Sequence, residues 1–269
     1  MRFFLFSFLL LSGTLQAAQN NASCPRIVSQ SPYITRALDW LGLERCIVGV
    51  SRYDTLDRPK TGGVIDPDAD SIALLEPQLM VTSNWTKAAT WQAVAPQGAV
   101  ALRVDGFRGM AGVETMLRDI GHAAGLADID ARVERFAANW RAAAQRVGGK
   151  GRRVLILSAC GMAPYSFGRG TTLHEVFTAA GFTVVADHDS IRNFHPDKPD
   201  GDVAAWITAR KPDYLFALKN RRDEACNIAI AMPGIPILPL DGPLFTHPGP
   251  DLLKGLEQLR DSMLEVNKP

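Results

Sequence analysis

The sequence lacks the short motifs that mark the common catalytic sites. It contains no GxSxG, no phosphate-binding GxxxxGK[ST], no GxGxxG and no HExxH. Its five histidines do not pair at metal-ligand spacing on one predicted helix, so a dedicated metal site is not expected. One nucleophile–base arrangement remains for a secreted α/β hydrolase: Ser158 or Cys160 with His195 or His247. We therefore expect a protein that is not an enzyme, with no catalytic residue, no metal ligand and no cofactor.

An excess of charge of either sign is also missing. The chain has 29 basic and 28 acidic residues, and the only charge in the first 18 residues is Arg2. Without those residues the charges balance, which argues against a nucleic-acid partner. Apart from the N-terminus, no apolar run is long enough to span a membrane.

The N-terminus has the pattern of an export signal. One arginine precedes a short apolar run, and small residues follow at Ala17 and Ala18. We expect residues 1–18 to be a signal peptide and the mature protein to be exported. The cysteines of an exported protein can pair. Cys24 and Cys46 each stand just before a strand-like run, so in neighbouring parallel strands they would meet at one edge. We predict the disulfide Cys24–Cys46 and leave a second pair, Cys160 with Cys226, open beside free thiols.

Strand and helix patterns alternate along the whole chain. Apolar runs predict strands at 26–31, 46–51, 79–83, 99–104, 152–159, 182–186, 214–218 and 235–240. Amphipathic patterns predict helices at 32–41, 69–75, 86–94, 109–124, 171–180, 202–210, 223–231 and 250–265. This alternation indicates parallel sheets that are covered by helices on both faces.

A longer helix is predicted between the two halves, at 128–147. Apolar residues recur there with the spacing of one helix face: Val133, Phe136, Ala137, Trp140, Ala144 and Val147. We expect an N-terminal α/β lobe at 19–125, an interdomain helix within 126–149 and a C-terminal α/β lobe at 150–269. The alternative is an ordinary helix packed on one domain.

Ligands of parallel α/β sheets bind beyond the carboxyl ends of the strands. The loops at those ends carry aromatic and basic side chains, which suit a flat or anionic ligand held between the lobes. These candidate ligand-binding residues are Tyr33, Arg52, Tyr53, Trp85, Tyr165, Arg169, Arg192, His195, Lys219, Arg221 and Phe245.

Five segments together resemble the periplasmic substrate-binding proteins of ABC importers for iron–siderophores, vitamin B12 (cobalamin) and haem. They are RIVSQSPYITRALDWLGLERCIVGVSRYD (26–54), SIALLEPQLMV (71–81), FGRGTTLHEVFTAAGF (167–182), ITARKPDYLFAL (207–218) and PLFTHPGPDLLKGLEQL (243–259). The likeness spans nearly the whole mature chain. It implies two α/β lobes, a single interdomain helix, a ligand cleft between the lobes and a monomer that delivers a metal chelate to a permease in the inner membrane.

In that family an acidic residue on each lobe meets arginines of the permease. Asp70 stands at the first of these positions, whereas Ala205 occupies the second, and Asp202, three residues earlier, is the substitute we expect. The basic residues near the predicted cleft favour a ferric siderophore. Cobalamin is an alternative ligand, because Trp85 lies in a loop where the B12-binding members present an aromatic residue. Haem is a further alternative, because Tyr53, Tyr165 or His195 could ligate its iron. The departure at Ala205 leaves room for a sensory or partner-interaction protein on the same fold.

Overall fold

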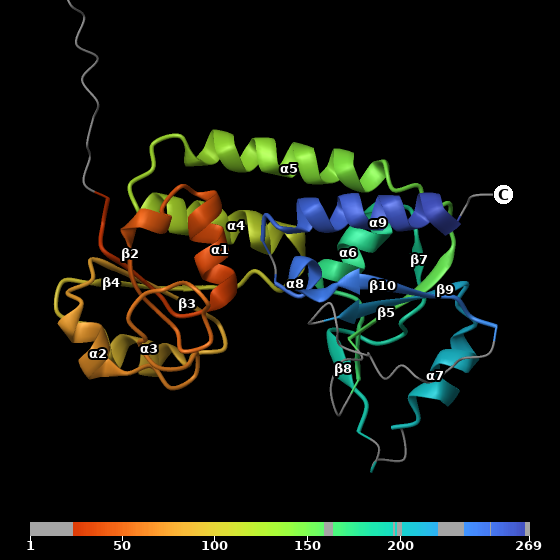
Figure 1. Ribbon diagram of the computed structural model, residues 1–269, viewed down its shortest axis with the longest axis horizontal. Coiled ribbons are helices and arrows are strands. Elements are labelled where there is room, and N and C mark those ends of the chain that lie inside the picture. Colours follow the sequence, from red (N-terminus) through yellow and green to blue (C-terminus); the bar gives the residue numbers. More distant parts are fainter. Residues whose placement is uncertain are drawn as a thin grey trace, which may run out of the picture.

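Four parallel strands form the sheet of the first lobe in the computed structural model (Figure 1), which describes residues 24–158, 164–195, 197, 201–219, 234–247 and 249–266. The strands β1 (Ile27–Ser29), β2 (Ile47–Val50), β3 (Leu79–Ser83) and β4 (Val100–Val104) lie in the order β2-β1-β3-β4. Parallel neighbours need crossover connections. Helices α1 (Pro32–Trp40), α2 (Ala69–Leu74) and α3 (Ala88–Ala93) lie in the three connections.

The period of two along each strand sends side chains to both faces of this sheet. Val28 and Met80 pack on Ile72 of α2 and Trp91 of α3. Residues one position away, such as Ile27, join the larger core on the α1 side. Both faces are therefore covered, as the near-continuous apolar runs predicted.

In the described residues of the second lobe, six strands form one sheet, and this sheet is mixed. Its order is β10-β9-β5-β6-β8, with β7 pairing beside β5. The strands are β5 (Arg153–Ser158), β6 (Tyr165–Phe167), β7 (Thr183–Val184), β8 (Ile191–Asn193), β9 (Tyr214–Lys219) and β10 (Ile237–Asp241), and the helices are α6 (Thr172–Ala179), α7 (Val203–Arg210), α8 (Gly242–Phe245) and α9 (Leu252–Val266). The helix expected at 223–231 lies outside the described residues.

The expectation of a purely parallel second sheet was wrong at β6. This strand is antiparallel to both β5 and β8. Only residues 159–164 separate β5 from β6, and a parallel crossover needs a dozen or more residues, so the chain must turn straight back. Strands β6 and β8 were not among the predicted strands.

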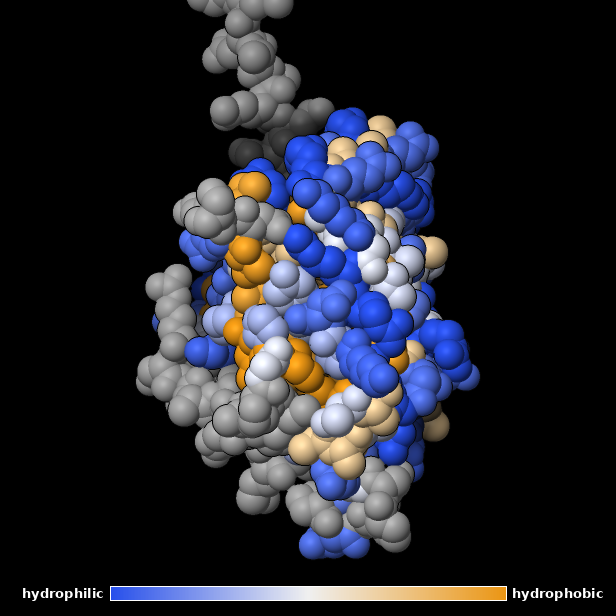
Figure 2. Space-filling model, turned by 90° about the vertical axis from the view of Figure 1, so that its right-hand side faces the viewer, coloured by the Kyte–Doolittle hydropathy of each residue, from blue (hydrophilic) through white to orange (hydrophobic). Residues whose placement is uncertain are grey.

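In Figure 2, which shows the end of the second lobe that lies away from the first lobe, most of the coloured surface on the right-hand side is hydrophilic, and apolar patches lie nearer the centre. Among the described residues, no helix is both long enough and apolar enough to cross a membrane.

Two antiparallel helices, α4 (Gly109–Ala123) and α5 (Ile129–Gln145), run along both lobes (Figure 1). The predicted face of α5 is buried, including Val133, Phe136 and Trp140. Near one end, Arg132 of α5 donates to the carbonyl oxygens of Trp40 and Leu41 in the first lobe, at 2.8 and 3.1 Å. Toward the other, α5 packs on α6 and α9 of the second lobe. Because α4 also packs on α6, the lobes are joined by a helical pair rather than by α5 alone.

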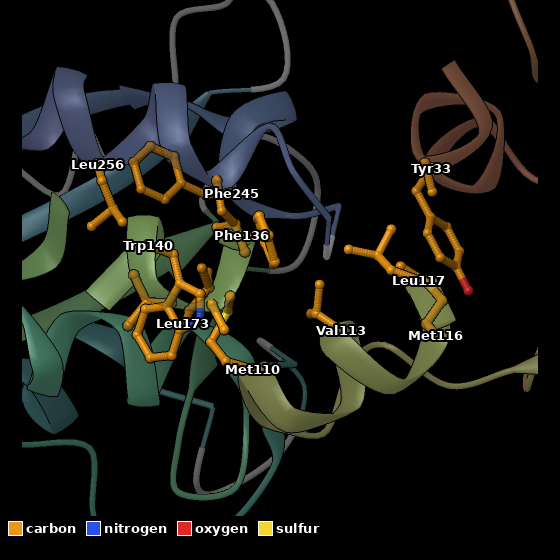
Figure 3. Close-up of a cluster of buried hydrophobic side chains, with 14 of the residues drawn as sticks. Tyr33, Met110, Val113, Met116, Leu117, Phe136, Trp140, Leu173, Phe245 and Leu256 are labelled. Carbon is orange, nitrogen blue, oxygen red and sulfur yellow. The ribbon is translucent and has the colours of Figure 1, made fainter. Parts of the chain in front are cut away.

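One continuous apolar core follows this helical pair from lobe to lobe. Figure 3 shows Met110, Val113 and Leu117 of α4 lying between Tyr33 on α1 and Phe245 on α8. All of these side chains belong to one cluster, which also contains strand residues of both sheets. Moving one lobe away from the other would expose this cluster to water, so we expect large opening motions to be strongly opposed.

Polar contacts also cross between the lobes. Arg36 of α1 donates to the carbonyl of Pro243 at 3.1 Å and pairs with Asp251 at 3.2 Å. Thr172 at the start of α6 donates to the carbonyl of Gly106 at 3.1 Å. Arg36 lies in the helix that follows β1, and Pro243 closely follows β10, so this contact brings the carboxyl ends of these two strands toward one another.

The predicted disulfide Cys24–Cys46 is confirmed, with an S–S distance of 2.01 Å. Cys24 precedes β1, and Cys46 ends the 3-10 turn η1 (Glu44–Cys46) just before β2. Ile27 and Ile47 are register partners in these parallel strands, which places both sulfurs at one edge. Cys160 and Cys226 lie outside the described residues.

Replacing Cys24 and Cys46 together by serine should lower the free energy of unfolding by about 3 kcal/mol, because the bond closes a loop of roughly two dozen residues in the unfolded chain. Urea unfolding followed by circular dichroism measures this difference. Equal midpoints for the parent and the double variant would contradict it.

His247 predicts a dependence of stability on pH. Burial, and then the nearby Arg36 charge, lower the pKa of His247 below its ordinary value, although Asp251 opposes this. The unfolded chain therefore takes up a proton first as pH falls through about 6.5, and stability is lost toward the lower folded pKa. His247→Gln should make the fall in unfolding free energy between about pH 7.5 and 5 shallower. Urea unfolding at several pH values measures it, and identical slopes would refute the assignment.

Candidate functional site

A short stack of aromatic rings lies at the carboxyl ends of the first-lobe strands. Trp85, after β3, stacks on Phe107, after β4, with ring centroids 5.4 Å apart and planes 15° apart. Tyr33, at the start of α1, packs edge-to-face with Phe107, and the centroids of these two rings are 5.2 Å apart. Trp85 is 63% exposed, whereas Tyr33 is only 4% exposed. The stack therefore offers one flat aromatic face to its surroundings and anchors that face in the core.

Hydrogen bonds hold the Trp85 turn in place from both sides. Arg103 of β4 donates to the carbonyl oxygens of Thr86 and Asn84 at 2.8 and 3.1 Å. The Thr86 hydroxyl donates to the carbonyl of Val64 at 2.5 Å, which joins this turn to the loop after β2. The aromatic face is thus fixed by its backbone before any ligand arrives, which reduces the entropy lost on binding.

The loop after β2 adds exposed groups to the same part of the lobe. Tyr53 is 64% exposed and Ile65 is 71% exposed. The Arg52 guanidinium pairs with Asp66 and lies 5.9 Å from the centroid of the Tyr53 ring. The loop therefore presents apolar surface and one charge pair, rather than the free cation that the sequence suggested.

Buried Asp54 fixes the shape of this loop. Its Oδ2 accepts from the Thr35 hydroxyl at 2.6 Å, and its Oδ1 accepts from the Leu56 backbone at 3.0 Å. Lys60 Nζ donates to the Asp54 carbonyl at 2.8 Å. These bonds connect the loop to the first turn of α1 and hold Tyr53 at the strand end.

Three predicted residues lie at the carboxyl edge of the second sheet. Tyr165 is the register partner of Ser158, the last residue of β5, and is partly buried. His195 follows β8 and is exposed. Lys219 ends β9 as the register partner of Asp241, and both are partly buried. The second lobe therefore brings a phenol, an imidazole and an ammonium to the edge that faces the first lobe.

The structure places two predicted arginines away from this edge. Arg169 follows β6, which runs back from the edge, and pairs with Asp189 at 2.9 Å. Arg192 lies over the rings of Phe194 and Trp206 at 5.0 and 5.9 Å, on the α7 side of the sheet. Arg169 departs because β6 is antiparallel to β5, which sequence reasoning did not anticipate. Arg192 departs because it lies within β8, a strand that was not predicted, with its side chain on the α7 side of the sheet.

Two predicted aromatic residues are core residues. Phe245 is 2% exposed, its ring centroid lies 6.1 Å from that of Phe177, and it packs against Gly255. Phe245 was expected to face a ligand, but in this structure the short helix α8 turns it into the core.

Burial raises the pKa of the Tyr33 phenol above its ordinary value, and the Ser83 side chain opposes this rise. Tyr33 is buried and contacts the Phe107 ring. Arg221 lies outside the described residues.

The two expected permease-docking residues, Asp70 and Asp202, occupy different positions relative to their helices. Asp70 is exposed in the first turn of α2, while neighbouring Asp68 caps that helix. Asp202 is exposed but is the N-cap of α7, and its Oδ1 accepts from the Ala205 backbone at 2.9 Å. Asp202 therefore has a local structural role and precedes the helix, instead of lying on its outer face.

The remaining histidines do not form a catalytic pair with Ser158. Within the described part of the chain its buried hydroxyl has no hydrogen-bond partner, and His195 is exposed. His188 Nε2 lies 2.5 Å from the buried Ser166 hydroxyl, and burial lowers the pKa of His188. Among the described residues, no three His, Cys, Asp or Glu side chains are placed to hold a metal ion.

Sequence reasoning missed Phe107, Ile65, Asp66 and Arg103. Phe107 could have been found, because it follows a predicted strand just as Trp85 does. Ile65 gave a weaker signal as an apolar residue in a loop rich in Gly, Pro and Asp. Asp66 and Arg103 matter through partners elsewhere in the chain, which no local pattern reveals.

Neither a family model nor a curated protein matches the chain. Solved structures match over nearly all of it. Haem-binding RhuT of Roseiflexus sp. RS-1 has a TM-score of 0.73 at 20% identity, covering 91% of this chain and 99% of its own. Vitamin B12-binding BtuF of Vibrio cholerae has a TM-score of 0.68 at 15% identity, and the match covers 91% of this chain and 99% of BtuF. Catecholate-siderophore-binding VctP of the same organism has a TM-score of 0.64 at 16% identity, and the match covers 90% of this chain and 94% of VctP. The chain thus has the two-lobed α/β fold of these periplasmic binding proteins, as its sequence resemblance predicted.

Proposed function

We propose that this protein is a periplasmic substrate-binding protein that carries a metal chelate with a flat face to an ABC importer in the inner membrane. The observation that carries this proposal is the exposed Trp85 ring stacked on Phe107 at the carboxyl ends of the first sheet. A flat aromatic surface suits a ligand with conjugated rings. In α/β proteins ligands bind at the carboxyl ends of the strands, and the Trp85 ring lies at such an end. The predicted signal peptide would place the mature chain in the periplasm.

Charge refines the choice of chelate. The sequence favoured a ferric siderophore because five basic residues were expected at the site. Arg52 is paired with Asp66, Arg169 is paired with Asp189, and Arg192 lies on the α7 side. Among the described residues, the flat face and the paired arginines suit cobalamin or haem better than a siderophore with several negative charges. A ferric siderophore with aromatic chelating groups stays in the proposal as the third candidate.

Haem would also need a ligand for its iron. The exposed side chains Tyr53 and His195 come from the first and the second lobe, and each carries an atom that can bind iron. Tyr165, partly buried at the edge of the second sheet, is a further candidate. Cobalamin would need no such ligand, since the aromatic face alone could hold it.

A sensory or partner-interaction role on the same fold is the second candidate. Two observations favour it. Ala205 stands where the sequence resemblance implies an acidic residue, and the Asp202 carboxylate already accepts a hydrogen bond from the Ala205 backbone as the N-cap of α7. A hydrolase is less well supported, because the buried Ser158 hydroxyl has no hydrogen-bond partner among the described residues.

Titration of the mature protein with cyanocobalamin, haemin and several ferric siderophores tests the ligand class. We expect one chelate to bind saturably at micromolar concentration or below, with quenching of tryptophan fluorescence. Trp85→Ala should weaken this binding by about tenfold or more, because a stacked aromatic contact dominates such a face. Calorimetry provides a signal that does not depend on Trp85.

Leu264→Ala is the matched control, since Leu264 is an exposed apolar residue on α9. It should leave the affinity unchanged. If no chelate in the panel binds, or if both variants weaken binding equally, the proposed ligand class is wrong.

Asp70→Arg distinguishes a transport role from a sensory one. If Asp70 meets arginines of a permease, reversing its charge should reduce uptake of the bound chelate by cells severalfold without changing its affinity. Glu134→Arg, on the exposed face of α5, is the control for the charge change. Undiminished uptake by the Asp70 variant would favour the sensory role.

A further inference from the structure

A tight turn after β2 presents one carboxylate to Arg52. The Gly63 backbone donates to the Asp66 carbonyl at 3.1 Å, and Gly62 has a φ of +84°, which favours glycine. The Arg52 backbone donates to the Gly62 carbonyl at 2.7 Å, so the arginine is held by the same turn that carries Asp66.

The charge pair lies directly over a glycine that has no room for a side chain. A Cβ on Gly63 would overlap Asp66 Oδ1 and would lie 3.2 Å from both Nε and Nη2 of Arg52. The turn, the missing Cβ and the ion pair therefore form one arrangement. The Arg52 side chain is still 48% exposed, so a ligand could reach its remaining donors.

This pair sits among the exposed apolar residues of the candidate site. Ile65 belongs to the same turn, and Tyr53 follows Arg52 directly. The bond from Thr86 to the Val64 carbonyl places the turn beside Trp85. An anionic ligand on the aromatic face would thus meet Arg52 with Asp66 already against it.

We propose that Asp66 is a specificity-determining residue, which holds the Arg52 guanidinium and so disfavours chelates with several negative charges. This inference rests on the proposed function and refines its ligand class. An anionic ligand must either displace the carboxylate from Arg52 or approach it closely, and like charges repel. A neutral chelate avoids both costs.

Asp66→Asn keeps the shape of the side chain and removes its charge. We expect this variant to bind a ferric tris-catecholate about two- to fivefold more tightly than the parent does, as suits a charge near the surface. Its affinity for neutral cyanocobalamin should not change. Added salt should reduce the gain, and Arg52→Gln combined with Asp66→Asn should abolish it.

Asp57→Asn is the matched control. Asp57 is exposed in the same loop, and its replacement changes the net charge equally without touching Arg52. Equal gains from Asp57→Asn and Asp66→Asn would mean that only overall charge matters and would overturn the inference. A gain of equal size for cyanocobalamin would also overturn it.

A second measurement separates this inference from the proposed function. Inorganic pyrophosphate is titrated while the side-chain Nε–Hε signal of Arg52 is followed by NMR. We expect a saturable shift in Asp66→Asn that is absent or much weaker in the parent. If no chelate binds, the proposed function fails, and this experiment still decides the inference: equal pyrophosphate responses in the two proteins reject it.

Discussion

The apolar core shared by the two lobes is the constraint on which the rest of the structure depends. Helices α4 and α5 bury one face against both sheets' helices, from Tyr33 at one end to Phe245 at the other. Hydrophobic burial is lost when such surfaces separate, and packed interiors deform little. The two strand edges are therefore held near one another, and the candidate site is made of two prearranged halves.

Within that frame, loop residues determine what the site can hold. The solved structures with the same fold bind haem, vitamin B12 or a catecholate siderophore according to their descriptions. A fold that serves such different ligands leaves the choice to side chains at the strand ends. On the first lobe those side chains are a stacked Trp85, two further exposed apolar residues and a cation that already has a partner. On the second lobe they are Tyr165, His195 and Lys219.

Several carboxylates that the sequence presents as charged surface are used locally. Asp54 fixes the Tyr53 loop, Asp66 pairs with Arg52, and Asp202 caps α7. Each bond satisfies a donor that would otherwise be left to water. Counting charged residues near a predicted site therefore overestimated the positive charge available to a ligand, and it also overestimated the negative charge available to a partner.

The sequence by itself determined the alternation of strands and helices, the buried face of α5, the parallel first sheet and the Cys24–Cys46 bond, because each of these depends on short-range periodicity or on neighbouring strands. It also placed Trp85 and Tyr53 just after predicted strands. His195 was expected in the loop after 182–186, whereas the structure places it after β8. Only the tertiary structure decided the direction of β6, the burial of Phe245 and the partners of Arg52 and Arg169. These depend on contacts between segments that are distant in the chain, such as the packing of α8 against α9, and no local pattern specifies such contacts.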